Sequence, residues 1–308
     1  MTSIVIPAHN EGRVIGRLLD ALLADPPDSG TDIVVVCNGC TDDTARVAAA
    51  RGPRVRVVEI PTPSKHAALR VGDEHARGFP RLYVDADVVV GAADVRALAG
   101  ALARNPGLLA AAPGRDIPLA GCAWPVRAYY RVWQRLPAVR EGLFGRGVIA
   151  VSEPGHARIA ALPPLMADDL AASLAFGPGE RRVVEAARVV VHPPRTWSDL
   201  IKRRIRAVTS SAEVERFQAA HPAGGPDAGM DGTVGKGRAV GKGRAGASVP
   251  SARTGAADLR ALLRARPGLF PAVVVFVAAA VAARRGARGA IRSGDFSTWL
   301  RDESSRGV

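Results

Sequence analysis

The first 90 residues alternate regularly between short, largely apolar runs and segments with helical periodicity. The runs at 3–6, 32–36, 54–60 and 81–85 are rich in valine and isoleucine, and Pro7 is expected to end the first of them. The segments between the runs place apolar residues at the spacing of one helix face. Apolar strands separated by helices are typical of a parallel sheet with helices on both faces. The alternation therefore predicts an α/β fold with a mostly parallel sheet.

Residues typical of helix ends predict where the helices in the first 105 residues begin and end. Asn10 is expected to cap the first helix, and Thr41 the second, which Gly52 would end. A further helix is expected around Asp94–Asn105.

Beyond residue 105 the alternation is less regular, but strands and helices still follow one another. The expected elements are strands at 107–114 and 145–152, helices at 123–136, 166–177 and 196–218, and a pair of strands within 181–192. The helix at 196–218 is expected to end the compact part of the chain. An aromatic stripe in the helix at 123–136, containing Tyr129 and Tyr130, favours core packing over contact with a sugar ring.

Charge is concentrated in the last third of the chain. The formal net charge is +13, and residues 195–308 hold 20 Lys and Arg against 9 Asp and Glu, a net +11. A basic tail suits an anionic membrane surface or a nucleic acid, but aromatic stacking residues are lacking from 222–266. We therefore expect no nucleic-acid partner, although a basic-tail nucleic-acid-binding protein remains an alternative.

The three cysteines cannot form a disulfide framework, and no second pair completes a zinc site with Cys37 and Cys40. These thiols are expected to be small residues in a tight loop. The chain opens as a strand and not as a signal peptide, so we expect a cytoplasmic protein.

Composition divides the chain into three regions. Residues 1–220 are expected to form one domain, with halves at 1–105 and 106–220, and 221–256 form a low-complexity Gly, Ala and basic linker. Residues 257–308 form a helical, basic and apolar tail. Its apolar segment 269–283 is short for a membrane span, so it either packs on the domain or rests at a membrane interface. The second option would place the protein at the inner face of the cell membrane.

Asp85 and Asp87 lie at the end of the fourth expected strand, with one alanine between them. In an extended chain, side chains at i and i+2 point to the same side, so these carboxylates are expected to converge. Like charges that close repel unless a cation lies between them, and Mg²⁺ and Mn²⁺ prefer carboxylate and phosphate oxygens. The alternative for an isolated pair is a polar strand end that caps the next helix.

Four stretches, IVIPAHNEGRVIGRLLDAL, VVVCNGCTDDT, SKHAALRVG and YVDADV, carry a family resemblance in their order and spacing. Together they resemble the nucleotide-sugar binding half of family 2 glycosyltransferases, which have the GT-A fold, and the resemblance covers about residues 2–210. It implies transfer of a sugar from a nucleotide-diphosphate donor to an acceptor hydroxyl, with inversion and normally with Mg²⁺ or Mn²⁺. The Gln-x-x-Arg-Trp signature of processive members is missing, which favours a single addition.

The resemblance also implies roles for individual residues. Asp87 and Asp85 would hold the metal, and Asp169 would be the catalytic base, with Asp168 one residue away. Cys37 and Asn38 stand where the family usually has paired acids, a departure that leaves open a non-catalytic sugar-nucleotide binder. Residues expected to contact the donor are Pro7, His9, Glu11, Asn38, Asp42, Lys65, Asp85 and Arg206. The acceptor is unknown, and a lipid-linked sugar is one candidate.

Overall fold

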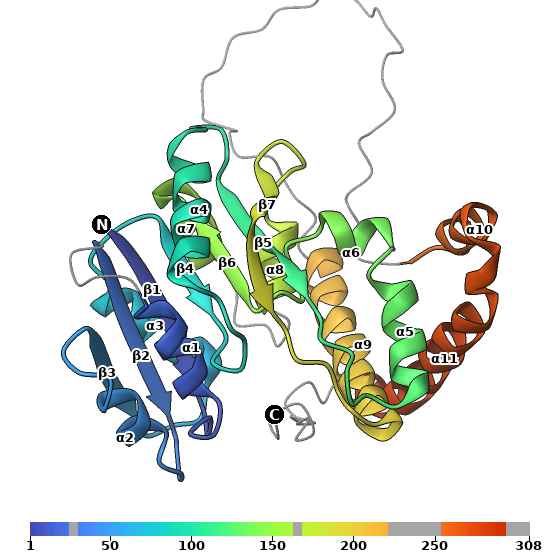
Figure 1. Cartoon of the computed structure of the whole chain (residues 1–308), viewed down its shortest axis with the longest axis horizontal. Helices are drawn as coiled ribbons and strands as arrows, with labels where there is room; N and C mark the ends of the chain where they lie inside the picture. Colours follow the sequence, from blue (N-terminus) through green and yellow to red (C-terminus); the bar gives the residue numbers. More distant parts are fainter. Residues whose placement is uncertain (25–29, 163–167, 221–253, 294–308) are drawn as a thin grey trace, which may run out of the picture.

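The computed structural model describes residues 1–24, 30–162, 168–220 and 254–293, so most of the linker expected at 221–256 lies outside the described residues. Its centre is a seven-stranded sheet with the order β3-β2-β1-β4-β6-β5-β7 (Figure 1). The strands are β1 (Thr2–Ala8), β2 (Thr31–Asn38), β3 (Val55–Ile60), β4 (Arg81–Val84), β5 (Ala110–Asp116), β6 (Val148–Val151) and β7 (Arg181–Val190).

The first four strands form the parallel half that the alternation predicts. β1 pairs with β2 and β4, and β2 pairs with β3, all in parallel. β1 continues through Pro7, so the expectation that this proline ends the strand is wrong. Proline lacks the N–H that a ladder needs, but β4 pairs with β1 only over Ser3–Val5, so Pro7 lies beyond that ladder.

The other half mixes directions. β6 is antiparallel to both β4 and β5, whereas β7 is parallel to β5. The strand pair expected within 181–192 is instead the single strand β7, whose register against β5 shifts between Pro113 and Gly114. The sheet is therefore mostly parallel, as the α/β prediction requires.

Eleven α-helices surround or extend this sheet in the described residues. They are α1 (Ile15–Leu22), α2 (Thr44–Ala49), α3 (Lys65–His75), α4 (Ala92–Ala103), α5 (Trp124–Trp133), α6 (Pro137–Glu141), α7 (Glu153–Ala160), α8 (Asp168–Leu174), α9 (Trp197–Ala220), α10 (Ala256–Ala265) and α11 (Phe270–Ser293), with a 3₁₀ turn η1 (Pro267–Leu269) before α11. α2 begins three residues after Thr41, which therefore does not cap it, and α4 begins two residues before Asp94.

Successive residues of β2 show that both faces of the sheet are covered. Ile33 and Val35 pack in one core cluster with Leu18 of α1, whereas Val34 packs in another with Ala68 of α3. Side chains alternate between faces along a strand, so α1 and α3 lie on opposite faces. The helix-covered parallel sheet is thus built from strands that are apolar on both sides.

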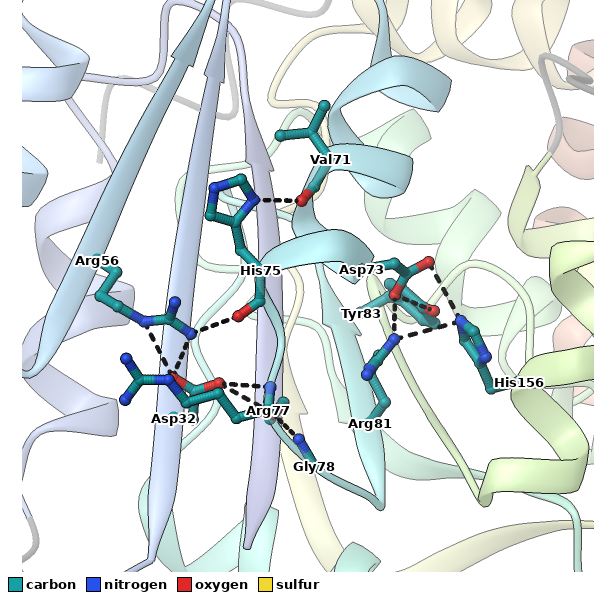
Figure 2. A network of polar contacts seen from close by, with 11 residues as sticks. Asp32, Arg56, Val71, Asp73, His75, Arg77, Gly78, Arg81, Tyr83 and His156 are labelled. Carbon is teal, nitrogen blue, oxygen red and sulfur yellow. Dashed lines mark hydrogen bonds and ion pairs between the residues drawn. The ribbon is translucent and has the colours of Figure 1, made fainter.

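Polar contacts fasten α3 to the sheet at its C-terminal end. Asp73 of α3 accepts hydrogen bonds from Arg81 Nη1 at 2.9 Å and from Tyr83 Oη at 2.8 Å, and His156 Nε2 lies 3.3 Å from its other oxygen. Figure 2 shows this cluster beside a second one centred on Asp32. Because Tyr83 is buried against a carboxylate, its pKa is raised. These contacts fix the direction of α3 and so position its first residue, Lys65.

The C-terminal helices extend the fold beyond β7. α11 packs against α5 and α9, and the three helices lie on the side of the molecule away from β3 (Figure 1). Tyr129 and Tyr130 of α5 are buried in this cluster, and the Tyr129 ring stacks on Phe276 at 5.1 Å. The expectation of core packing for this aromatic stripe is confirmed, and the apolar segment 269–283 packs on the domain.

Candidate active site

The carboxyl ends of three neighbouring parallel strands lie along one edge of the sheet. β1 ends at Ala8, β2 at Asn38 and β4 at Val84, and the three strands are adjacent in the sheet. The segments that follow them therefore leave the sheet side by side. In open α/β sheets this edge is where ligands bind.

Asn10 joins the segment after β1 to the segment after β2. Its Oδ1 accepts hydrogen bonds from Thr41 N at 2.7 Å and Asp42 N at 3.3 Å. Its backbone has φ +53°, in the left-handed region that asparagine tolerates better than most residues. α1 begins at Ile15 without a side-chain cap, so the prediction that Asn10 caps this helix is wrong.

Glu11 and Asp42 lie at the same junction. Glu11 N donates to Thr44 Oγ1 at 2.8 Å, and the Asp42 carboxylate accepts from Thr44 N at 3.0 Å and from Gly12 N at 3.1 Å. Both residues thus help to set the distance between the two segments. Their expected contacts with the donor stay predictions.

His9 and Asn38 are neighbours at this edge. His9 Nδ1 lies 2.6 Å from the backbone oxygen of Asn38, and Asn38 Nδ2 donates to Ala8 O at 2.9 Å. Asn38 Oδ1 accepts from Ser64 N at 3.1 Å, and the residue is only 3% exposed. The amide of Asn38 therefore holds three segments together, and its contact with a donor stays a prediction. Pro7, two residues before His9, is buried within β1.

The two thiols of the second segment serve packing. Cys40 Sγ donates to Ala8 O at 3.4 Å, and Cys37 is buried at the end of β2. Burial raises the pKa of the Cys37 thiol to about 12, so it is protonated at neutral pH. A protonated, buried thiol is a poor nucleophile and a poor metal ligand.

Lys65 begins α3, as the sequence suggests, and reaches the end of β4. Its Nζ donates to Asp85 Oδ1 at 2.8 Å, and both side chains are about one-third exposed. Ser64 caps the same helix by accepting from Ala67 N. An ammonium group at a helix N-terminus beside a carboxylate is a suitable contact for a phosphate group.

Asp85 and Asp87 do not lie in an extended segment. β4 ends at Val84, and Ala86 and Asp87 form a turn in which Val88 N approaches Asp85 O at 3.4 Å. The argument that an extended chain makes the two carboxylates converge is therefore wrong. The described residues also contain no group of three or more His, Cys, Asp or Glu arranged to hold a metal.

A backbone bridge brings the segment after Asp87 to the end of β7. Val89 and Val190 form an antiparallel bridge with two backbone hydrogen bonds, of 3.0 and 2.8 Å. Asp87 and His192 each lie two residues from this bridge, Asp87 in a turn and His192 beyond the end of β7. Burial lowers the pKa of the His192 imidazole, whereas the negative charge of Asp87 raises it, so the two side chains are close enough to interact electrostatically.

Basic residues surround this acid and imidazole. Arg203 Nη1 of α9 donates to His192 O at 3.3 Å, and the charges of Arg17 and Arg195 also lower the pKa of His192. Burial and the two arginine charges thus favour the neutral ring, which is the form that binds a metal. A carboxylate, a neutral imidazole and nearby guanidinium groups suit a divalent cation that carries a diphosphate. Sequence reasoning missed His192, Arg17 and Arg195, because no local motif marks them.

A short glycine loop connects Asp85 to Asp169. Gly147 O accepts from Asp85 N at 2.8 Å, and Gly145 N donates to Asp169 Oδ2 at 2.7 Å. Both glycines have φ +65°, and a Cβ on Gly147 would lie 2.5 Å from Val88 Cγ1. The loop thus requires glycine at both positions, and it holds the predicted metal-binding turn and the predicted base at fixed separation.

The arginine within this loop points into the protein. Arg146 is 2% exposed and donates to the backbone oxygens of Gly142 and Pro113 at 3.0 and 2.8 Å. Burial lowers its pKa to about 10. Arg115 lies beside the loop, with its guanidinium 4.7 Å from the centre of the Trp133 ring and Nη1 donating to Gly145 O at 3.3 Å. These two cations support the loop from the interior.

The remaining predicted site residues are less closely defined. Asp169 Oδ1 also accepts from Leu170 N at 2.7 Å, whereas the side chain of Asp168 lies outside the described residues. Arg206 lies on α9, one turn after Arg203, and is half-buried. The structure therefore gathers Lys65, Asp85, Asp87 and Asp169 around one loop system, and it does not establish a ligand for any of them.

The fold and this edge define an α/β protein of the class that binds nucleotides beyond the carboxyl ends of its strands. Residues 3–148 match the family described as glycosyl transferase family 2. This region, a little less than half of the chain, therefore resembles glycosyl transferase family 2.

Solved structures with low sequence identity share the fold. The mannosyltransferase PcManGT from Pyrobaculum calidifontis, in complex with GDP-Man and Mn²⁺, aligns with a TM-score of 0.54 at 20% identity, over 99% of this chain and 84% of its own. Glucosyl-3-phosphoglycerate synthase from Mycobacterium tuberculosis, in complex with Mn²⁺, UDP and glucosyl-3-phosphoglycerate, aligns with a TM-score of 0.51 at 21% identity, over 74% of this chain and 82% of its own. These likenesses confirm the GT-A type of sheet.

Curated relatives match shorter stretches. A dolichyl-phosphate beta-glucosyltransferase of Trichomonas vaginalis is 35% identical over 97 residues, which are 28% of this chain and 29% of the relative. An uncharacterized glycosyltransferase of Mycobacterium tuberculosis is 36% identical over 123 residues, 40% of this chain and 52% of the relative. A 4,4'-diaponeurosporenoate glycosyltransferase of Staphylococcus aureus is 38% identical over 91 residues, 28% of this chain and 24% of the relative. The chain spans about half or less of the length of these relatives.

Proposed function

We propose that this chain is a glycosyltransferase that moves one sugar from a nucleotide-diphosphate sugar to an acceptor hydroxyl, with inversion and with Mg²⁺ or Mn²⁺. The observation that supports the proposal is the Val89–Val190 bridge, which brings the turn containing Asp87 near His192 at the carboxyl edge of the parallel strands. The family match over residues 3–148 supports the same assignment.

Positively charged side chains from several elements would contact the donor diphosphate. Lys65 at the start of α3 and the arginines near His192 offset its negative charge, and the Lys65–Asp85 ion pair holds the ammonium group in position before the donor arrives. Pro7, His9, Glu11, Asn38 and Asp42 shape the pocket for the base and ribose, since they define the spacing between the first two segments. Arg206 on α9 contributes a further positive charge.

Asp87 and His192 would hold the metal, with donor phosphate oxygens as further ligands and Asp85 at the ribose or at metal-bound water. The donor set fits, because a carboxylate oxygen, an imidazole nitrogen and phosphate oxygens are common ligands of Mn²⁺ and Mg²⁺. When bound, the metal neutralises charge that develops on the leaving nucleoside diphosphate.

Asp169 is the base in this proposal. An inverting transfer is a single displacement, so one group must take the proton of the acceptor hydroxyl as that oxygen attacks the anomeric carbon. The backbone N–H groups of Gly145 and Leu170 each occupy one site on the Asp169 carboxylate and orient it. Each carboxylate oxygen has two lone pairs, so capacity to accept the proton remains.

The acceptor in this proposal is a hydroxyl of a lipid-linked molecule at the inner face of the cell membrane. Two relatives are named for dolichyl phosphate and for 4,4'-diaponeurosporenoate, which supports a lipid-type acceptor but not the hydroxyl itself. The lack of the Gln-x-x-Arg-Trp signature in α9 supports one addition per acceptor.

The test is release of nucleoside diphosphate from a panel of UDP-, GDP-, ADP- and dTDP-sugars, with Mn²⁺ or with a chelator and no metal. One donor should release its nucleotide faster with Mn²⁺, and release should rise when an extract of cell lipids supplies acceptor. A folded protein that binds a nucleotide sugar tightly but never releases the nucleotide would be a non-catalytic binder. A folded protein that neither binds nor cleaves any donor would contradict the whole proposal.

A further inference from the structure

α11 has one face that belongs to the core. Its buried residues follow helical spacing and pack against α5 and α9, and Arg216 Nη2 of α9 donates to Ile291 O at 2.5 Å. The buried residues are Ala272, Val273, Phe276, Ala279, Ala283 and Ala287. This face fixes α11 on the domain along most of its length.

The opposite face of the same helix is apolar and exposed over its first half. Phe270 is 62% exposed, Val274 53%, Val277 42% and Val281 39%. Their spacing of four, three and four residues places them in one stripe, about 16 Å long at the rise of an α-helix. Large apolar residues scattered singly need no explanation, but a continuous exposed stripe marks an interaction surface.

The same stripe becomes basic over its second half. Arg284, Arg285, Arg288 and Arg292 are exposed, and their positions continue the helical spacing that Val281 ends. α11 contains no acidic residue. One helix face therefore carries an apolar half followed by a half with four positive charges.

The neighbouring helix α5 presents a related surface. Trp124 is 65% exposed, Arg127 and Arg131 follow it at helical spacing, and Arg135 lies in the turn after the helix; all three arginines are exposed. Tryptophan and arginine are the residues found where a protein meets the headgroup region of a bilayer.

We propose that the exposed face of α11 binds the surface of an anionic lipid bilayer, with the apolar stripe at the boundary of the acyl chains and the arginines among the headgroups. Charge complementarity selects this partner, since the face carries four positive charges and no negative one. A second copy of the chain is less suitable, because pairing two such faces side by side in parallel brings the arginines together.

This arrangement differs from a membrane span. Residues Pro267–Ser293 are long and apolar enough to cross a membrane by length and composition. Spanning would remove the core face from α5 and α9 and separate Phe276 from the Tyr129 ring. Docking of the exposed face leaves these contacts intact. The surface does not depend on sugar transfer and can be tested without a donor.

The test is flotation of the full-length protein with vesicles of phosphatidylcholine alone or with 30% phosphatidylglycerol, at low and high salt. The wild-type protein should float with the anionic vesicles at low salt and much less with neutral ones. The double variant Arg284→Gln/Arg288→Gln should lower the partition coefficient by about fivefold for each arginine removed. The charge-matched control Arg46→Gln/Arg104→Gln removes exposed arginines from other helices and should change it by less than about twofold.

The apolar half needs its own variant, because basic residues elsewhere in the tail can also attract anionic lipid. Val274→Gln/Val277→Gln keeps every charge and should lower the partition coefficient at least tenfold, with an unchanged melting temperature. Equal flotation of this variant and the wild type would overturn the proposal, as would equal flotation with neutral vesicles. A wild-type dimer that the valine variant converts to monomer, with no flotation, would assign the face to a second copy instead.

Discussion

Val89 and Val190 exchange two backbone hydrogen bonds, and this single bridge brings the end of β7 to the turn that follows β4. Asp87 and His192, each two residues from the bridge, are close enough for the charge of Asp87 to raise the pKa of His192. The sheet edge thus has an imidazole from residues 106–220 near a carboxylate from residues 1–105. The proposed metal site depends on this joint between the two halves.

The glycine loop predicts a clear stability difference between two alanine variants. Gly147→Ala should lower the free energy of unfolding by at least about 2 kcal/mol, because left-handed backbone strain adds to overlap with Val88. Gly121→Ala shares the positive φ, 73°, but its Cβ would meet nothing within 4 Å, so about 1 kcal/mol is expected. Urea denaturation of both variants measures the difference, and equal losses would contradict the packing assigned to Gly147.

If Asp169 is the base, replacing it should lower the rate of sugar transfer without changing the affinity for the donor. Asp169→Asn keeps an oxygen that can accept from Gly145 N but cannot take a proton, so transfer should fall by at least about a hundredfold while donor affinity changes little. Calorimetry and a nucleotide-release assay measure the two quantities. Asp168→Asn is the matched control and should retain most activity. The reverse result, an inactive Asp168→Asn and an active Asp169→Asn, would make Asp168 the base.

The backbone conformation and the side-chain hydrogen bonds of Asn10 should contribute separately to the free energy of unfolding. Asn10→Gly keeps the left-handed backbone but loses the acceptor for Thr41 N and Asp42 N, so it should lower the free energy of unfolding by about 1–2 kcal/mol. Asn10→Ala also adds backbone strain and should cost about 1 kcal/mol more. Thermal or urea unfolding compares the two. A glycine variant as stable as the wild type would show that the side-chain bonds do not contribute.

The parallel half of the fold could be predicted because its evidence is local. Each strand there is a continuous apolar run, and one helix separates each strand from the next along the chain, so the strands run parallel and their ends fall on one edge. Lys65 begins α3, and β4 ends at Val84, one residue before the predicted end of the run 81–85.

The other half was harder because its pairings are not local. β6 inserts antiparallel between β4 and β5, and neither periodicity nor spacing records that choice. His192 comes near Asp87 through the bridge between β7 and a segment far away in the sequence. The sequence also favours an extended conformation at Asp85–Asp87, whereas the structure has a turn there. A short run of alternating acidic and small residues is compatible with a strand or with a turn. Asn10 and Thr41 both resemble helix caps in sequence. In the structure, the Asn10 side chain joins two loops, and Thr41 lies three residues before its helix begins.

Calorimetric titration of Mn²⁺ and nucleoside diphosphate into the wild type and three variants tests the central claim most directly. The wild type should bind the diphosphate at least tenfold more tightly with Mn²⁺ than without it, because Asp87 and His192 hold the metal that carries the phosphates. Asp87→Asn and His192→Ala should each remove most of that gain, whereas Asp20→Asn, an exposed carboxylate of α1, should keep it. A metal-dependent gain that survives both site variants would contradict a metal site shared by Asp87 and His192.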